Sequence, residues 1–494
     1  SVTRLIVGPD RAWLPEGLAA GGRAAGIAVS LYGLRSSRNW GCGDLTDLER
    51  IAEWAAAELG ASFIGLNPLH AISNRQPFNT SPYLPNSVFY RNLIYIDVER
   101  LEDFQASRNA RALFADPAVQ QEVASLRDAP LVEYERVHAL KLRFLKLCFE
   151  TFFTGALGDA ASARRFEAYC EKEGRLLDLF ALHSALDAWM HERDPRIWTW
   201  GQWPEEYQHP DSEAVRLFAA EHAKDVLFYK YIQWRFDEQL EAVQRHAAGA
   251  GLTIGLYHDL ALATDRWGAD CWAHREFFAG NCSVGAPPDD FCPKGQDWGF
   301  PPPNSGRHRR DGYRLFAESI RHNMRRGGAL RIDHVMRFFR LFWIPEGMDA
   351  AQGAYVRDLH QDLLRIVTLE SVRNRVMIIG EDLGTVAPEV RHTLERFGIL
   401  SYRLLYFERR PDGAFRQPGE YPRQALASST THDLPTLAGF WVGRDIEVRY
   451  QAGLLDSLEA CRAQWAQRAR DKQRLLDALF QAGLLPDWFP RDAA

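Results

Sequence analysis

Short apolar and β-branched runs alternate along the chain with stretches of helical periodicity. Between residues 45 and 59, apolar positions recur every three or four residues, as they do on the buried face of an amphipathic helix. The short runs are almost continuously apolar, which is typical of strands buried on both faces of a sheet. The candidate strands are 26–33, 63–69, 253–261, 329–335, 376–383, 401–407 and 425–432.

This alternation predicts an α/β fold with a parallel sheet. We expect a (β/α)8, TIM-type barrel with helical insertions. Because seven strands are recognised where such a barrel has eight, the last strand is either hidden in the sequence or missing from this chain. A barrel without one strand would expose two sheet edges.

The chain is expected to have five parts. These are a lead-in segment that may end a missing N-terminal region (1–24), the first part of a catalytic barrel (25–99), a helical insertion subdomain (100–250), the barrel core with an active-site loop at 284–306 (251–441), and a truncated C-terminal helical segment (442–494). The insertion is predicted from long helical patterns such as that of 226–246. The loop is predicted because 284–306 is rich in proline and has little periodicity.

Composition narrows the class of protein. The 494 residues include 59 Lys and Arg and 65 Asp and Glu, a net charge of −6, and 25% of residues are charged. This is ordinary for a soluble globular protein and unfavourable for general nucleic-acid binding. Apolar runs are far shorter than the ~18 residues that a membrane span needs. The seven scattered cysteines indicate reduced thiols, so we predict a cytoplasmic protein. The net charge and the short apolar runs predict no nucleic-acid and no membrane partner.

Familiar cofactor motifs are not found. The sequence has no P-loop, no nucleophile elbow and no H-E-x-x-H zinc motif. Cys282 and Cys292 do not have the paired spacing of a zinc site. We therefore expect no metal and no organic cofactor.

Four acids stand near the ends of candidate strands: Asp259, Asp333, Glu381 and Asp433. Strand ends converge in a barrel, so these acids can face one cleft, and their repulsion would raise the pKa of at least one. One protonated and one ionised carboxyl group is what glycosidic bond cleavage requires. The alternative for each acid alone is a helix cap or a structural ion pair.

Two further features favour a sugar site. Arg331 and Asp333 are two residues apart on one strand and share a face, where a guanidinium would keep the aspartate ionised. Many of the 15 Trp lie beside Pro or Gly, as expected for exposed loop aromatics that stack on sugar rings. The alternative is that most of them anchor loops or fill the core.

The residues around these acids resemble a known family. ALRIDHVMR (329–337), IIGEDLGTVAPEV (378–390) and STTHDLPTL (429–437) are similar to the signature segments of the 4-α-glucanotransferases, or amylomaltases, of the α-amylase clan. SPYLPNS (81–87) and GAPPDDFCPKGQDWG (285–299) also match. The resemblance runs from about residue 25 to about residue 441 and is greatest to the longer bacterial subgroup.

The resemblance implies the chemistry of a retaining enzyme. Asp333 would be the nucleophile, Glu381 the general acid and then the general base, and Asp433 the residue that grips the 2- and 3-hydroxyls of the distorted sugar. Retention requires the two catalytic carboxyl groups to lie about 5–5.5 Å apart.

The resemblance also implies the binding residues. Arg331 would orient Asp333, Asp259 and His432 would bind hydroxyls of the same sugar, and Tyr83 would stack beneath its ring. Asp289, Gln296 and Trp298 fall on the motif of the loop over the acceptor, where Trp298 is either a sugar platform or a loop anchor. Asp290 stands where much of the family has a tyrosine.

The implied activity is transfer of an α-1,4-glucan segment to an acceptor glucose or maltooligosaccharide, without a cofactor. The implied partners are maltooligosaccharides and α-1,4-glucans. The alternatives are an α-glucan hydrolase of the same clan and a glucan-binding, inactive barrel. The sequence leaves the oligomeric state open.

Overall fold

The computed structural model describes residues 5–75, 79–155, 160–289, 292–384, 386–455 and 457–492. The chain divides into two compact units, residues 1–378 and residues 379–494. Each of the seven candidate strands of the sequence overlaps a strand of the structure. The domain boundaries expected from the sequence stay predictions.

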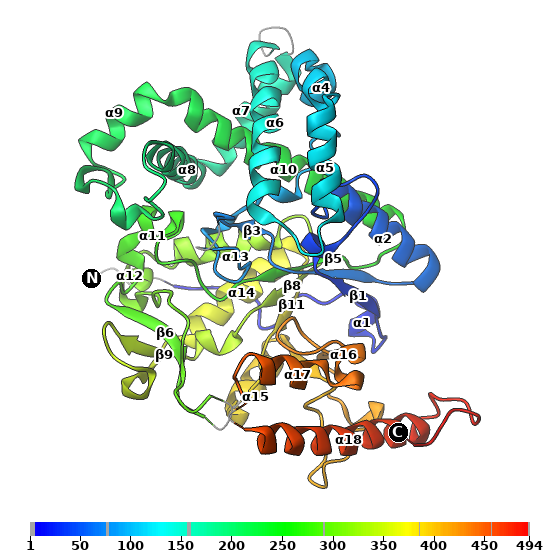
Figure 1. The fold of residues 1–494 in the computed structure, drawn as a ribbon. Helices are drawn as coiled ribbons and strands as arrows, with labels where there is room; N and C mark the ends of the chain where they lie inside the picture. Colours follow the sequence, from blue (N-terminus) through cyan, green and yellow to red (C-terminus); the bar gives the residue numbers. More distant parts are fainter. Residues whose placement is uncertain are drawn as a thin grey trace. The chain divides into compact units, whose positions relative to one another are not determined.

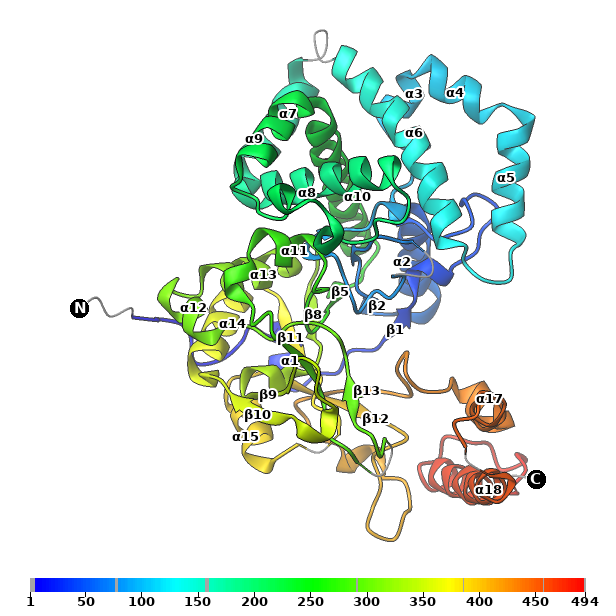
Figure 2. The same cartoon turned by 60° about the vertical axis from the view of Figure 1, so that its left-hand side comes forward.

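Four parallel strands form the centre of the first unit. They are β1 (Gly26–Val29), β2 (Phe63–Leu66), β5 (Gly255–Leu260) and β8 (Ala329–Ile332), paired in that order (Figure 2). All residues of β5 and β8 are buried, as their nearly continuous apolar pattern predicts. Helix α2 (Leu45–Leu59) connects β1 to β2, and Asp44 caps its first turn.

Helices fill the chain between β4 (Ser87–Arg91) and β5, and they stand together in Figure 1. Their bounds are α3 (Glu102–Ala106), α4 (Arg108–Phe114), α5 (Pro117–Asp128), α6 (Tyr134–Gly155), α7 (Ala160–Glu173), α8 (Arg175–Arg193), α9 (Glu213–Glu221) and α10 (Ala223–Gly249). Phe144 of α6 and Tyr231 of α10 belong to the same apolar core as Ile64 of β2 and Leu256 of β5. The inserted helices and the strands therefore bury their apolar faces together.

A second sheet covers part of the segment that the sequence predicts as a loop. Its strands are β6 (Cys282–Ala286), β7 (Gln296–Asp297), β9 (Arg340–Pro345) and β10 (Ala354–Arg357), all antiparallel, in the order β10-β9-β6-β7. The two ends of the proline-rich segment are thus paired strands. The sequence pattern did not show this because β7 has only two residues and both are exposed.

The remaining helices of the first unit surround these sheets. They are α1 (Glu16–Ala19), α11 (Ala269–Ala273), α12 (Ser305–Arg310), α13 (Arg314–Met324) and α14 (His360–Asn374). A short strand, β3 (His70–Ala71), pairs with β4.

The second unit repeats the strand–helix alternation. The end of β11 (Met377–Gly380) pairs in parallel with β12 (Leu400–Leu404), and β12 pairs in parallel with β13 (Ala425–Ser428). The helices are α15 (Pro388–Arg396), α16 (Leu437–Val442), α17 (Arg444–Gln451) and α18 (Leu458–Gln481). No strand follows β13 in the described part of this unit.

The segment that carries Tyr83 is docked on the chain that follows β5. The carbonyl of Pro85 accepts hydrogen bonds from Thr264 Oγ1 (3.0 Å) and from the Asp265 amide (2.8 Å). A Cβ atom at Gly268 would lie 2.5 Å from the Asn86 carbonyl, so only glycine permits this close approach. The position of Tyr83 therefore depends on the contact between its own segment and residues 264–268.

Asp270 closes the same junction from α11. Its Oδ2 accepts the amide of Val88 at 2.8 Å, and only 5% of its surface is exposed. No cationic side chain lies within 4 Å of it among the described residues. Burial raises the pKa of Asp270 to about 7, against the opposing effect of hydrogen bonds from Ser87 and Val88.

Lys141 of α6 fixes the inserted helices to the strand region. Its side chain is 1% exposed, and Nζ donates to the carbonyls of Ile94 (2.5 Å) and Ile96 (2.7 Å).

We expect Lys141→Met to lower the free energy of unfolding by roughly 2–4 kcal/mol, because two buried carbonyl groups lose their donor. Urea unfolding followed by tryptophan fluorescence measures this. Lys146→Met, at an exposed position of the same helix, is the control. An unchanged unfolding midpoint in the Lys141 variant would contradict the assigned role.

The raised pKa of Asp270 predicts a pH dependence of stability. An unfolded aspartate has a pKa of about 3.9, so between pH 4 and pH 7 the unfolded chain releases a proton that the folded chain keeps. The contribution of Asp270 to stability is therefore complete at low pH and is lost as the pH rises through about 7. Asp270→Asn removes this loss. The free energy of unfolding of Asp270→Asn, minus that of the wild type, should therefore increase by roughly 2–3 kcal/mol when the pH is raised from 5 to 8.

Thermal or urea unfolding at a series of pH values tests this prediction. The control is Asp128→Asn, at an exposed position at the end of α5, which should follow the wild-type profile. Parallel profiles of wild type and Asp270→Asn would refute the prediction.

Candidate functional site

A single guanidinium joins two of the predicted acids. Asp259 of β5 and Arg331 of β8 are directly paired across the parallel sheet. Arg331 Nη1 donates to Asp259 Oδ1 (2.7 Å) and Oδ2 (2.9 Å), and Arg331 Nη2 donates to Asp333 Oδ1 (2.8 Å). The Asp333 amide also donates to the Leu260 carbonyl at 3.0 Å. The first unit thus brings these three predicted residues together.

Burial and charge set the electrostatics of this group. Burial raises the pKa of Asp259, Arg331 opposes this, and the net pKa lies above the ordinary value of an aspartate. Burial alone would lower the pKa of Arg331, but the carboxylates of Asp259 and Asp333 raise it well above its usual value. Arg331 therefore stays charged. The expectation of one acid with a raised pKa is met at Asp259, with burial as the main cause.

Asp333 is half-buried, and its two oxygens differ. Oδ1 accepts the hydrogen bond from Arg331. For Oδ2, the described residues provide no hydrogen-bond donor. An aspartate held by one oxygen and open at the other can present the open oxygen to a ligand.

Tyr83 extends the network from the docked segment. Its hydroxyl donates to Asp259 Oδ2 at 2.6 Å. Burial raises the pKa of Tyr83, and the charge of Asp259 raises it further, so the phenol stays neutral and remains a donor. This hydrogen bond to Asp259 is not among the roles that the resemblance implies for Tyr83. Stacking of the Tyr83 ring beneath a sugar stays a prediction.

The segment after β6 supplies aromatic surface beside Asp333. Trp298 Nε1 donates to Gln296 Oε1 at 2.9 Å, so the two predicted residues support one another. The ring of Trp298 lies 5.4 Å from the ring of His334, edge to face, with an interplanar angle of 80°. His334 directly follows Asp333 and has a φ of 47°, which is unusual for a residue other than glycine.

Asp289 lies in the turn between β6 and β7. Its Oδ1 accepts the amide of Cys292 at 2.6 Å, and its own amide donates to the Cys292 carbonyl at 3.1 Å. Asp290 lies outside the described residues. The structure therefore gives Asp289 a part in holding the turn, and its predicted contact with substrate stays a prediction.

In the second unit, Glu381 directly follows β11. It is 8% exposed, and its Oε1 accepts the amide of Leu383 at 2.7 Å. The next residue, Asp382, accepts hydrogen bonds from Ser401 Oγ (2.6 Å) and from the Tyr402 amide (2.9 Å). These bonds fix the end of β11 against β12 and thereby the backbone that carries Glu381.

His432 and Asp433 follow β13. His432 Nε2 lies 3.3 Å from Asp433 Oδ1, so the two predicted neighbours interact. The Asp433 side chain is 77% exposed, which leaves its carboxylate open to a ligand. The Asp433 amide donates to Thr431 Oγ1 at 3.3 Å.

Four residues that support the site were missed at the sequence level. The left-handed backbone of His334 has no sequence signal. Asp382 could have been suspected, because an acid beside Glu381 at a strand end needs donors of its own. Asp265 and Asp270 are far from Tyr83 in sequence, and only the fold places them beside its segment.

The described residues contain no group of three or more His, Cys, Asp or Glu side chains that could hold a metal ion. All seven cysteines are described and unpaired. None of the described helices has both the length and the apolar character that a membrane crossing requires.

Comparison with known proteins identifies relatives over almost the whole chain. The family model described as 4-alpha-glucanotransferase matches residues 29–491. The 4-alpha-glucanotransferase of Haemophilus influenzae is 38% identical over 494 residues, covering 99% of this chain and 70% of the relative. That of Mycobacterium tuberculosis is 38% identical over 499 residues, covering 98% of this chain and 66% of the relative.

Solved structures show the same fold. The amylomaltase of Corynebacterium glutamicum aligns with a TM-score of 0.85 and 32% identity, over 98% of this chain and 65% of that chain. The amylomaltase of Streptococcus agalactiae, solved with acarbose, aligns with a TM-score of 0.73 and 18% identity, over 93% of this chain and 87% of that chain. The second likeness concerns the fold alone. The first confirms the predicted α/β, TIM-type class.

The chain spans about two thirds of the length of the bacterial relatives that match it at 32–38% identity. The matched segments include the strand ends that carry Asp333, Glu381 and Asp433. Because the family model covers most of the chain and the Haemophilus relative matches nearly all of it, the chain belongs to the 4-alpha-glucanotransferase family.

Proposed function

We propose that the chain transfers a segment of an α-1,4-glucan to the 4-hydroxyl of an acceptor glucose or maltooligosaccharide, with retention at the anomeric carbon. The observation that carries the proposal is Asp333, held through Oδ1 by Arg331 and open at Oδ2 among the described residues. A nucleophile must be oriented without being covered, and this arrangement does both. Membership of the family supports the same activity.

In the first step, Asp333 Oδ2 forms a bond to the anomeric carbon of the donor sugar. Glu381 gives its proton to the glycosidic oxygen, and the chain beyond that oxygen leaves. In the second step, the 4-hydroxyl of the acceptor gives its proton to Glu381 and attacks the anomeric carbon, which releases Asp333. The carboxyl separation of about 5–5.5 Å stays a prediction.

The other residues bind the sugar in this proposal. Asp433 accepts hydroxyl groups of the donor sugar, which its exposure supports, and His432 lies beside it. Asp259 holds the guanidinium of Arg331 through two hydrogen bonds. We assign Asp259 a second role, the binding of a hydroxyl group of the same sugar. Tyr83 offers its ring to that sugar while its hydroxyl stays on Asp259.

The segment that carries Asp289, Gln296 and Trp298 is proposed to lie over the acceptor. Transfer exceeds hydrolysis only if an acceptor sugar reaches the intermediate in place of water. The edge-to-face contact of Trp298 with His334 puts its ring near the residue that follows Asp333. The unpaired cysteines support the predicted cytoplasmic location.

Incubation with pure maltotriose tests the activity. We expect glucose together with maltopentaose and longer chains, separated by chromatography. Glucose and maltose alone would identify the rival hydrolase. Binding of maltotriose without any product would identify a glucan-binding, inactive barrel.

Asp333→Asn should lower turnover of maltotriose at least about a thousandfold, because an amide oxygen is a far weaker nucleophile than a carboxylate. Binding of maltotriose, measured by calorimetry, should remain. The control is Asp211→Asn, at an exposed position of the same unit, which should keep wild-type turnover. Turnover that survives in Asp333→Asn would show that another residue is the nucleophile.

Trp298→Ala should raise the ratio of hydrolysis to transfer several-fold, because water would gain access beside His334. The ratio is measured as reducing ends formed against maltopentaose formed from maltotriose. Trp54→Ala, at an exposed position of α2, is the matched control. A ratio equal to that of the wild type would make Trp298 a loop anchor only.

A further inference from the structure

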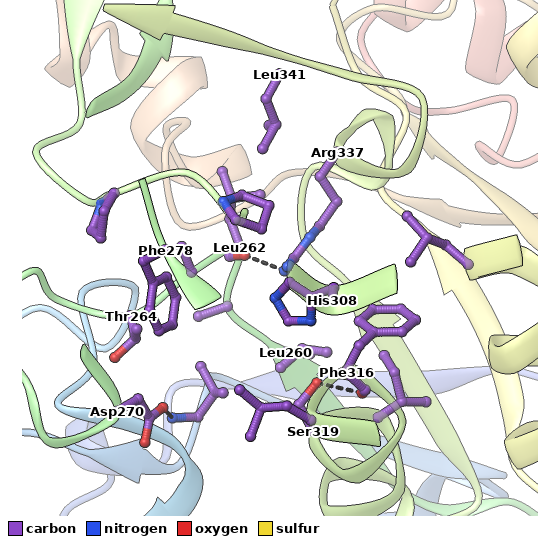
Figure 3. Close-up of a pocket in the computed structure, with 18 of the residues that line it drawn as sticks. Leu260, Leu262, Thr264, Asp270, Phe278, His308, Phe316, Ser319, Arg337 and Leu341 are labelled. Carbon is purple, nitrogen blue, oxygen red and sulfur yellow. Dashed lines mark hydrogen bonds between the residues drawn. The ribbon is translucent and has the colours of Figure 1, made fainter. Parts of the chain in front are cut away.

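A cavity of about 90 Å³ lies in the first unit; Asp270 is among its lining residues, whereas Asp259 and Asp333 are not. Its walls come from the chain after β5, from α13, from the turn η6 (Val335–Phe338) and from β9 (Figure 3). The walls are mainly apolar, with Leu260, Leu262, Phe316 and Leu341 around the space. A single water needs only about 10–15 Å³, so this cavity can hold a small organic molecule.

His308 of α12 supplies an acceptor to the cavity. Burial lowers the pKa of His308 to about 4, so the imidazole is neutral at neutral pH. The backbone of Phe277 opposes this lowering of the pKa. Nδ1 is buried and has no hydrogen-bond partner among the described residues. In a neutral imidazole that carries its proton on Nε2, Nδ1 has a lone pair and needs a donor.

Arg337 of η6 supplies a donor. Its side chain reaches toward His308 in Figure 3, and Nη1 donates to the Leu262 carbonyl. In the described part of the chain, no carboxylate lies within 4 Å of this guanidinium. Burial lowers the pKa of Arg337 to about 10, which still leaves it charged at neutral pH. Its other N–H groups are available to an acceptor.

Two carboxyl groups, Asp358 and Asp270, line the cavity together with Arg337. Asp358 also lines it and offsets the charge of Arg337, while its oxygens accept Ser305 Oγ (2.7 Å) and the Leu359 amide (2.7 Å). A charged ligand would therefore meet one like charge as well as one opposite charge. A neutral ligand meets neither penalty.

We propose that this cavity binds a short neutral alcohol, with an alkyl chain of about four carbons on the apolar walls. A hydroxyl group is small and neutral, and a single oxygen atom both donates and accepts. It donates to His308 Nδ1 and accepts from the Arg337 guanidinium. An ether lacks the donor, a carboxylate brings a charge and no donor, and an ammonium lacks the acceptor. This site does not depend on the proposed function.

The probe is 1-butanol, titrated into the full chain and followed by saturation-transfer NMR. Diethyl ether, butanoate and butylammonium, which are of similar size, are titrated in parallel. We expect saturable binding of 1-butanol with a Kd of about 1–10 mM and binding of the other three at least about fivefold weaker. Equal binding of 1-butanol and diethyl ether, or no saturation by 1-butanol up to about 50 mM, would overturn the proposal.

Two variants place the binding in this cavity. His308→Leu removes the acceptor, and Ser319→Leu, on α13, fills part of the space that Ser319 lines. Each should weaken 1-butanol binding about five- to tenfold or more. Ser184→Leu is the matched control. Ser184 Oγ donates to the Phe180 carbonyl (2.8 Å) in the same way as Ser319 Oγ donates to the Phe316 carbonyl (2.7 Å). Ser184 lies on α8, and it does not line the cavity. Wild-type affinity in both cavity variants would refute the site.

Discussion

The first unit depends on one buried guanidinium. Arg331 carries a positive charge into the sheet, and a buried charge is tolerated only when it is paired and hydrogen-bonded. The partners come from two strands, Asp259 on β5 and Asp333 on β8, so the register of these strands and the charge balance of the site are the same constraint. A shift of one residue would turn Arg331 to the other face of the sheet, away from Asp259, and leave that buried acid without its guanidinium. The alignment that stabilises the sheet thus also orients the proposed nucleophile.

Much of this arrangement could be predicted from the sequence, because it follows from local pattern. Each of the seven apolar runs overlaps a strand, and Asp259, Asp333 and Glu381 lie at or directly after the ends of β5, β8 and β11. The pairing of Arg331 with Asp333 follows from their spacing of two residues on one strand. These features depend on neighbours in the sequence or on the regular geometry of a strand.

The rest depends on contacts between distant segments. The hydroxyl of Tyr83 reaches Asp259, which is 176 positions away, only because its segment docks on residues 264–270. The strand β7 has only two residues and is too short to show a pattern, and the sheet forms because β6 pairs with both β7 and β9. The left-handed conformation of His334, with a φ of 47°, is uncommon for a residue other than glycine and leaves no periodic signal in the sequence. Periodicity carries no information about such features.

The shared core of the inserted helices and the strands has a consequence for how this chain can vary. Phe144 and Tyr231 are packed in one cluster with Ile64 and Leu256, so the insertion is not a module that could be exchanged while the sheet remains intact. An accepted change on α6 or α10 has to fit β2 and β5, and β5 carries Asp259. Divergence in this region is therefore expected at exposed helix positions, and the buried faces of the helices should change only together with the strands beneath them.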